Sequence, residues 1–112
     1  MEKQILFAIS SYNEKYYFSP MAQKLPKEIK LDLKKIGIYF ANKLKGIFTI
    51  GFYENGDIFI ESSCLENDFE YDEIGAKLEI ERFKQEKKEL LSSLILWNKV
   101  LQEIGKDKKI ES

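Results

Sequence analysis

Residues 80–104 read IERFKQEKKELLSSLILWNKVLQEI, and our prediction of the fold starts from this stretch. Its apolar residues recur at alternating steps of three and four, which is typical of a helix with one buried face. Lys87 is the one position of the series that is not apolar. Neither Gly nor Pro breaks the series, so the pattern predicts one long helix from about Asp72 to about Gly105. The positions of the series are Ile80, Phe83, Lys87, Leu90, Leu94, Trp97, Leu101 and Ile104.

A helix of this length is longer than the domain that we expect to carry it. It would extend for about 50 Å at about 1.5 Å per residue, whereas a compact domain of 112 residues has a radius of gyration of about 13 Å. Unless the helix bends at the charged run Lys84–Glu89 and stays on its own sheet, its apolar residues need cover, and a second copy of the chain is the simplest source. We therefore predict a homodimer, which Leu94→Glu should disrupt. Its interface residues are Leu90, Leu94, Trp97, Leu101 and Ile104.

The middle of the chain predicts a second helix, which begins at Leu25-Pro26 and ends at Gly46. Proline suits the first helical position, since its missing N–H would be unpaired there, and glycine tolerates the left-handed backbone found at helix ends. Gly37 lies inside this helix, where glycine is unfavourable, so we expect close packing of the helix on the sheet at that point. The apolar stripe comprises Ile29, Leu33, Ile36, Phe40 and Leu44.

Two β-hairpins flank this helix. The first is predicted from alternating apolar residues over Gln4–Ser11 and Lys15–Ser19, and the second from Ile47–Tyr53 and Ile58–Ser62. The second hairpin turns at an Asn-Gly pair, residues 55–56, which favours a type I′ turn with positive φ at both residues.

The element order is therefore β-β-α-β-β-α. We predict an α+β fold, in which the two hairpins form an antiparallel sheet with a mid-chain helix and the long C-terminal helix packed on one face. A length of 112 residues fits a single domain over residues 1–112. Residues 105–112 are expected to form a charged tail that frays.

Composition excludes several classes of protein. The net charge is −1 with 33% charged residues, which provides no basic field for nucleic acid or for an anionic membrane surface. No apolar run approaches the ~18 residues of a membrane span. The single cysteine, Cys64, rules out an intramolecular disulfide and fits a reducing compartment. We expect a cytoplasmic protein that binds neither nucleic acid nor membrane.

The candidate chemical groups are few, because the chain has no histidine and so lacks the commonest acid–base group and metal ligand. The acidic stretch Glu66–Glu73 offers oxygen ligands for Ca²⁺ or Mg²⁺, but it lacks the glycine of an EF-hand loop, and a solvated entry to the long helix is the simpler interpretation. Cys64 has acidic neighbours rather than the positive surroundings of a reactive thiol, so we expect a half-buried structural cysteine. The aromatic run at 12–18 indicates sheet packing or a protein interface, with stacking of single-stranded nucleic acid as the alternative. We expect no catalytic residue, no metal site and no cofactor.

The chain carries SYNEKYY at 11–17, KLP at 24–26, GIFT at 46–49, YDEIG at 71–75 and EKKELL at 86–91. In these motifs, which extend over most of its length, it resembles an uncharacterised family of short proteins from low-GC Gram-positive bacteria. The resemblance implies a bacterial protein without an assigned activity, and it supplies no catalytic residue.

Our leading hypothesis is a non-enzymatic protein-interaction module that acts on another protein and is homodimeric through its C-terminal helix. The alternative is a small-ligand-binding or regulatory domain with an apolar pocket between the sheet and the helices. An enzyme that uses only Asp, Glu, Lys, Tyr or Cys is a third interpretation.

Overall fold

The computed structural model describes residues 3–66 and 68–111, with side chains as far as Ile104. Over this part of the chain it confirms the α+β class and the four-stranded antiparallel sheet. The predicted element order is wrong at the C-terminus, where two helices replace one. The elements are β1 (Lys3–Ser10), β2 (Lys15–Phe18), the short 3₁₀ helix η1 (Ala22–Lys24), α1 (Lys27–Leu44), β3 (Ile47–Tyr53), β4 (Ile58–Ser63), α2 (Glu73–Glu86) and α3 (Lys88–Glu111).

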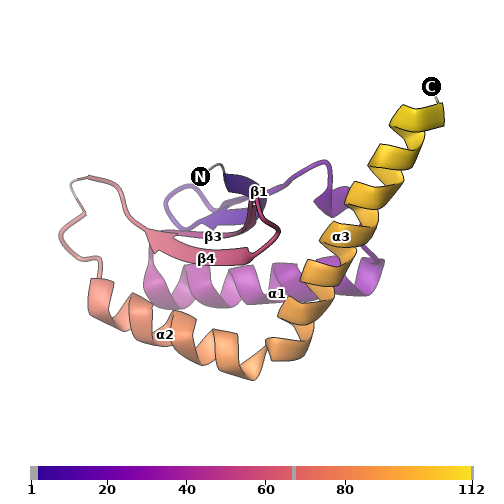
Figure 1. Cartoon of the computed structure of the whole chain (residues 1–112). Helices are drawn as coiled ribbons and strands as arrows, with labels where there is room; N and C mark the ends of the chain where they lie inside the picture. The colour runs from indigo at the N-terminus through magenta and orange to yellow at the C-terminus, as the bar shows by residue number, and fades with distance from the viewer. Residues whose placement is uncertain (1–2, 67, 112) are drawn as a thin grey trace.

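The sheet joins the two hairpins through their first strands, in the order β2-β1-β3-β4. All neighbouring strands are antiparallel, and β1 pairs with both β2 and β3. A bulge between Ile5 and Phe7 shifts the register of the β1–β3 pair. Figure 1 shows α1 and α2 together on one face of this sheet, while α3 rises past the ends of the strands.

The core is centred where α1, α2 and the sheet meet. The rings of Phe40 and Phe48 stack with centroids 4.2 Å apart, and Phe83 meets Phe40 edge-on at 5.5 Å. The predicted close approach of α1 to the sheet is confirmed at Gly37, since a Cβ atom there would lie 2.6 Å from Cζ of Phe7.

The predicted long helix is divided at Lys87, whose φ of −113° and ψ of 31° are not helical. The break turns α3 so that Leu91 and Leu94, which are 8% and 1% exposed, reach the core of their own chain. Each buried leucine contributes about 1.5–3 kcal/mol, more than the modest gain from continuing a helix through one exposed residue. The bend that the sequence left as an alternative is therefore the one that forms.

The distal half of α3 nevertheless extends beyond the domain. The molecule measures 52 × 27 × 26 Å with a radius of gyration of 15.0 Å, compared with about 13 Å for a compact chain of this length. Figure 1 shows this half of α3 projecting past the sheet. The helical backbone continues through the predicted end at Gly105 to Glu111. The side chains of the predicted tail, residues 105–112, lie outside the described residues, so its fraying stays a prediction.

Two local predictions require correction. Pro26, with φ −54° and ψ 146°, is the N-cap of α1 rather than its first helical residue. The second hairpin does not turn through type I′ geometry, which requires a positive φ at both Asn55 and Gly56. Gly56 has a φ of +94°, but the non-glycine residues with positive φ in the described chain are Glu14 and Lys45, and Asn55 is not among them. The N–H of Gly56 donates to the carbonyl of Tyr53 at 2.9 Å, which fits a type I turn followed by a glycine bulge.

Candidate functional site

The residues predicted as a partner interface occupy different environments in the structure. Leu94 is 1% exposed and belongs to the core, and Leu90 and Trp97 pack partly buried against that core. Leu101 is half-buried, and Ile104 is 47% exposed. The first half of the predicted surface is therefore covered by the chain itself. Leu94→Glu would report on folding rather than on association.

The apolar stripe that is exposed on the distal half of α3 shares Ile104 with the predicted interface and adds two residues that were not predicted, Leu96 and Val100. Leu96, Val100 and Ile104 are 62%, 39% and 47% exposed, and their spacing of four places them on one side of the helix. The buried residues Leu94 and Asn98 lie on the opposite side. The signal was present in the sequence, because Leu96 and Val100 are apolar residues that the series of threes and fours does not include.

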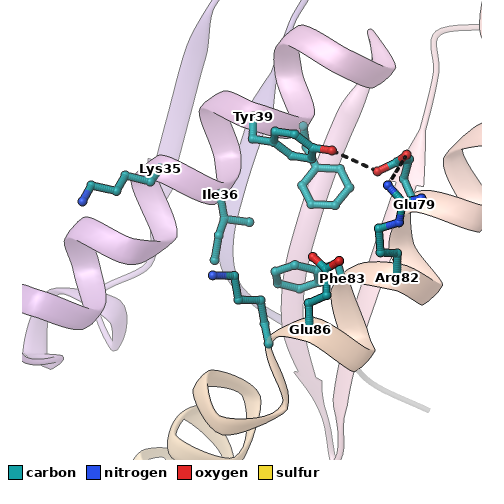
Figure 2. A pocket seen from close by; sticks show the side chains of 9 residues that line it. Lys35, Ile36, Tyr39, Glu79, Arg82, Phe83 and Glu86 are labelled. Carbon is teal, nitrogen blue, oxygen red and sulfur yellow. Dashed lines mark hydrogen bonds and ion pairs between the residues drawn. The ribbon is translucent and has the colours of Figure 1, made fainter.

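A hollow of about 270 Å³ lies between α1 and α2. Ile36, Phe40 and Phe83, all less than 10% exposed, supply its apolar walls. Figure 2 shows Ile36 and Tyr39 extending from α1, and Phe83 and Glu86 extending from α2 toward them. The predicted alternative placed an apolar pocket between the sheet and the helices, whereas this hollow lies between two helices.

One side of the hollow is held together by Glu79, whose side chain is only 16% exposed. Its carboxylate accepts a hydrogen bond from the Tyr39 hydroxyl at 3.1 Å. It also pairs with Lys43 at 3.4 Å and with Arg82 at 3.8 Å. Burial acts to raise the pKa of Glu79, but the Tyr39 hydroxyl, Lys43 and Arg82 outweigh it, so the pKa lies below its usual value. The same contacts with Tyr39 and Glu79 raise the pKa of Lys43.

The other side of the hollow carries two charges of opposite sign, on Glu86 and Lys87. Neither side chain forms an ion pair or a hydrogen bond with another side chain among residues 3–66 and 68–104. Lys35 also borders the hollow, but Figure 2 shows its side chain extending away from the other residues. The hollow therefore combines a paired carboxylate at one side with an unpaired carboxylate and an unpaired ammonium group at the other.

Asn98 stands apart among the buried residues of α3. It is 5% exposed, and its Oδ1 atom has no hydrogen-bond partner in the described part of the chain. Asn98 borders a broad cleft of about 890 Å³ between α3 and the adjoining strand ends, which also includes Gln4, Phe52 and Gln102. Leaving a buried polar atom unpaired costs about 1–3 kcal/mol.

The acidic stretch Glu66–Glu73 performs structural roles in the residues that are described. Asp72 caps α2, and its side chain accepts the N–H of Gly75 at 2.9 Å. Asp68 accepts a hydrogen bond from the Tyr12 hydroxyl, which raises the pKa of Tyr12. The stretch therefore forms the solvated entry to α2 and is also hydrogen-bonded to the β1–β2 turn.

Cys64 is exposed, so the predicted half-buried position is wrong.

Among the side chains as far as Ile104, apart from residue 67, no cluster of three or more Cys, Asp or Glu is arranged to hold a metal ion. None of the described helices combines the length and hydropathy that a membrane crossing requires.

The fold and its surfaces define an α+β protein with a four-stranded antiparallel sheet, helices packed on that sheet and a projecting C-terminal helix. Residues 3–107 match the model of a family described as "Family of unknown function (DUF6145)", and the chain belongs to this family. Searches among curated proteins and among solved structures give no match. The predicted membership of an uncharacterised family is confirmed, while the bacterial origin stays a prediction.

Proposed function

We propose that the protein is a non-enzymatic protein-interaction module that pairs with a second copy of itself through the distal half of α3. The observation that carries this proposal is the exposed stripe of Leu96, Val100 and Ile104 on a helix that extends past the domain. Grouped apolar side chains on a projecting element mark an interaction surface. The lack of histidine supports a role without catalysis.

The stripe is complementary to itself. Leu96 and Ile104 stand four residues before and after Val100. An antiparallel pair of helices with a twofold axis at Val100 therefore places Leu96 of each copy against Ile104 of the other, which is the arrangement that a symmetric dimer requires. Because Leu94 and Asn98 hold the opposite side of α3 against its own domain, the two domain bodies lie on opposite sides of the helix pair.

The contact is small, so we expect a weak, concentration-dependent dimer. Full burial of a Leu, Val or Ile side chain contributes about 1.5–3 kcal/mol, and exposures of 62%, 39% and 47% reduce that contribution in proportion. The stripes of two copies then supply roughly 4–9 kcal/mol, against an association cost of at least about 4 kcal/mol. With contributions from the half-buried Trp97 and Leu101, the dissociation constant falls at roughly 0.1–1 mM.

Sedimentation velocity from about 10 µM to about 1 mM, which brackets this range, tests the proposal. The sedimentation coefficient of the full chain should rise with concentration. Val100→Glu should abolish the rise, because two carboxylates would meet at the twofold axis. The matched control is Leu78→Glu, which changes a 67% exposed apolar residue on α2 and should leave the rise intact. A constant coefficient for the unmodified chain, or unchanged association of Val100→Glu, would overturn the proposal.

A further inference from the structure

The hollow between α1 and α2 differs from the α3 stripe in kind, since it is enclosed on two sides and bordered by charges as well as by apolar side chains. We propose that it binds a single free α-amino acid with an apolar side chain. The side chain would contact Ile36, Phe40 and Phe83, the ammonium group would pair with Glu86, and the carboxylate would pair with Lys87. This inference does not depend on pairing through α3.

The size of the hollow selects a small ligand. Its volume of about 270 Å³ exceeds the roughly 150 Å³ of a dry cavity that holds a benzene molecule. It also falls short of the roughly 300–1,000 Å³ of pockets for drug-sized ligands. A ring or branched aliphatic group with a short charged head fits between these limits. The walls formed by Ile36, Phe40 and Phe83 supply the apolar contact for that group.

The charges select the head group. Glu79 is already paired with Lys43 and Arg82 and hydrogen-bonded by Tyr39, so it offers no free charge to a ligand. Glu86 and Lys87 border the same hollow without a side-chain partner among residues 3–66 and 68–104. A ligand with one charge would leave either Glu86 or Lys87 unmatched. A free amino acid carries both complementary charges, on an ammonium group and a carboxylate that are bonded to the same carbon atom.

An NMR titration of the ¹⁵N-labelled full chain with L-phenylalanine tests this inference. A ligand of this size at an open site should bind with a dissociation constant of about 1 mM, and the amide signals of Ile36 and Phe83 should shift with saturation. Two analogues show whether the ligand is a free amino acid or the terminal residue of a peptide. N-acetyl-L-phenylalanine lacks the ammonium group and L-phenylalaninamide lacks the carboxylate, and each should bind about tenfold more weakly.

Variants assign the two charges. Glu86→Gln and Lys87→Gln should each weaken L-phenylalanine binding about tenfold. Glu86→Gln should leave the binding of N-acetyl-L-phenylalanine unchanged, and Lys87→Gln should leave the binding of L-phenylalaninamide unchanged, because the affected charge has no counterpart in that analogue.

The matched controls are Glu81→Gln and Lys84→Gln, which alter an ion-paired glutamate and lysine of α2 outside the hollow and should preserve the affinity. All four sites are exposed, so the spectra should show folded protein. The absence of saturable shifts at about 10 mM L-phenylalanine, tenfold above the expected constant, would overturn the inference. Equal binding of all three compounds, or unchanged affinity in both hollow variants, would also overturn it.

Discussion

Replacing Asn98 with leucine should stabilise the protein, which is unusual for a substitution at a buried position. Asn98 is 5% exposed and its Oδ1 atom has no hydrogen-bond partner in the described residues. An unpaired buried polar atom costs about 1–3 kcal/mol. Leucine has the same branched shape, so it should fill the same space without a cavity, and it gains a few tenths of a kcal/mol in helix propensity. Asn98→Leu should therefore raise the free energy of unfolding by about 1–2 kcal/mol.

Urea unfolding followed by Trp97 fluorescence measures this effect where it arises, because Trp97 is the single tryptophan of the chain and adjoins Asn98 on α3. With a denaturant slope of about 2 kcal/mol per molar urea, the midpoint should rise by about 0.5–1 M. Gln102→Leu is the control, since Gln102 is an exposed amide of the same helix and cleft and should change stability by less than about 0.5 kcal/mol. A lower midpoint for Asn98→Leu would refute the reasoning, because it would mean that a buried water pairs with the amide.

Two further substitutions test the packing of α1 and the charge network beside the hollow. Gly37→Ala should lower the melting temperature, because the new Cβ atom would lie 2.6 Å from the fully buried ring of Phe7. The overpacking costs about 1–3 kcal/mol, which outweighs the gain of about 1 kcal/mol in helix propensity. A higher melting temperature would show that the ring moves aside. Glu79 has a lowered pKa in the folded chain, so its stabilisation is complete above the ordinary glutamate pKa of about 4.3 and is lost as the pH falls through the lower folded value. Glu79→Gln should therefore reduce the free energy of unfolding at pH 7, and this difference should shrink as the pH falls through the lowered folded pKa. A difference that stays equal between neutral and strongly acidic pH would contradict this assignment.

Local patterns predicted most of the secondary structure because each element carries its own signal. The alternation of Ile47–Tyr53 and Ile58–Ser62 lies within β3 and β4, and the stripe from Ile29 to Leu44 lies within α1. Even the packing role of Gly37 was predictable, since glycine in a helix interior is unfavourable unless a close contact requires it.

The division of the C-terminal helix was not predictable from the series itself. The sequence located the possible bend, in the charged run Lys84–Glu89 that contains Lys87, but the steps of three and four continue across it and do not show that the helix divides. The break arises because Leu91 and Leu94 reach a core formed by distant parts of the chain. The exposed stripe on α3 follows from the same tertiary contacts, which decide the side of the helix that is buried. The hollow was beyond prediction for a related reason, because Ile36 and Glu86 border one hollow only once α1 and α2 lie on the same face of the sheet.

The central position of β1 has a consequence for the newly made protein. β1 is synthesised first, yet one of its two partners, β3, ends only at Tyr53. At about 5–20 residues per second, roughly 2–9 s pass between the synthesis of these two strands. During that interval the apolar segment Ile5–Ile9 has an unpaired edge, which is the kind of surface on which chains aggregate. Because β1 lies between β2 and β3, its pairing is complete only after the chain has been made as far as Tyr53.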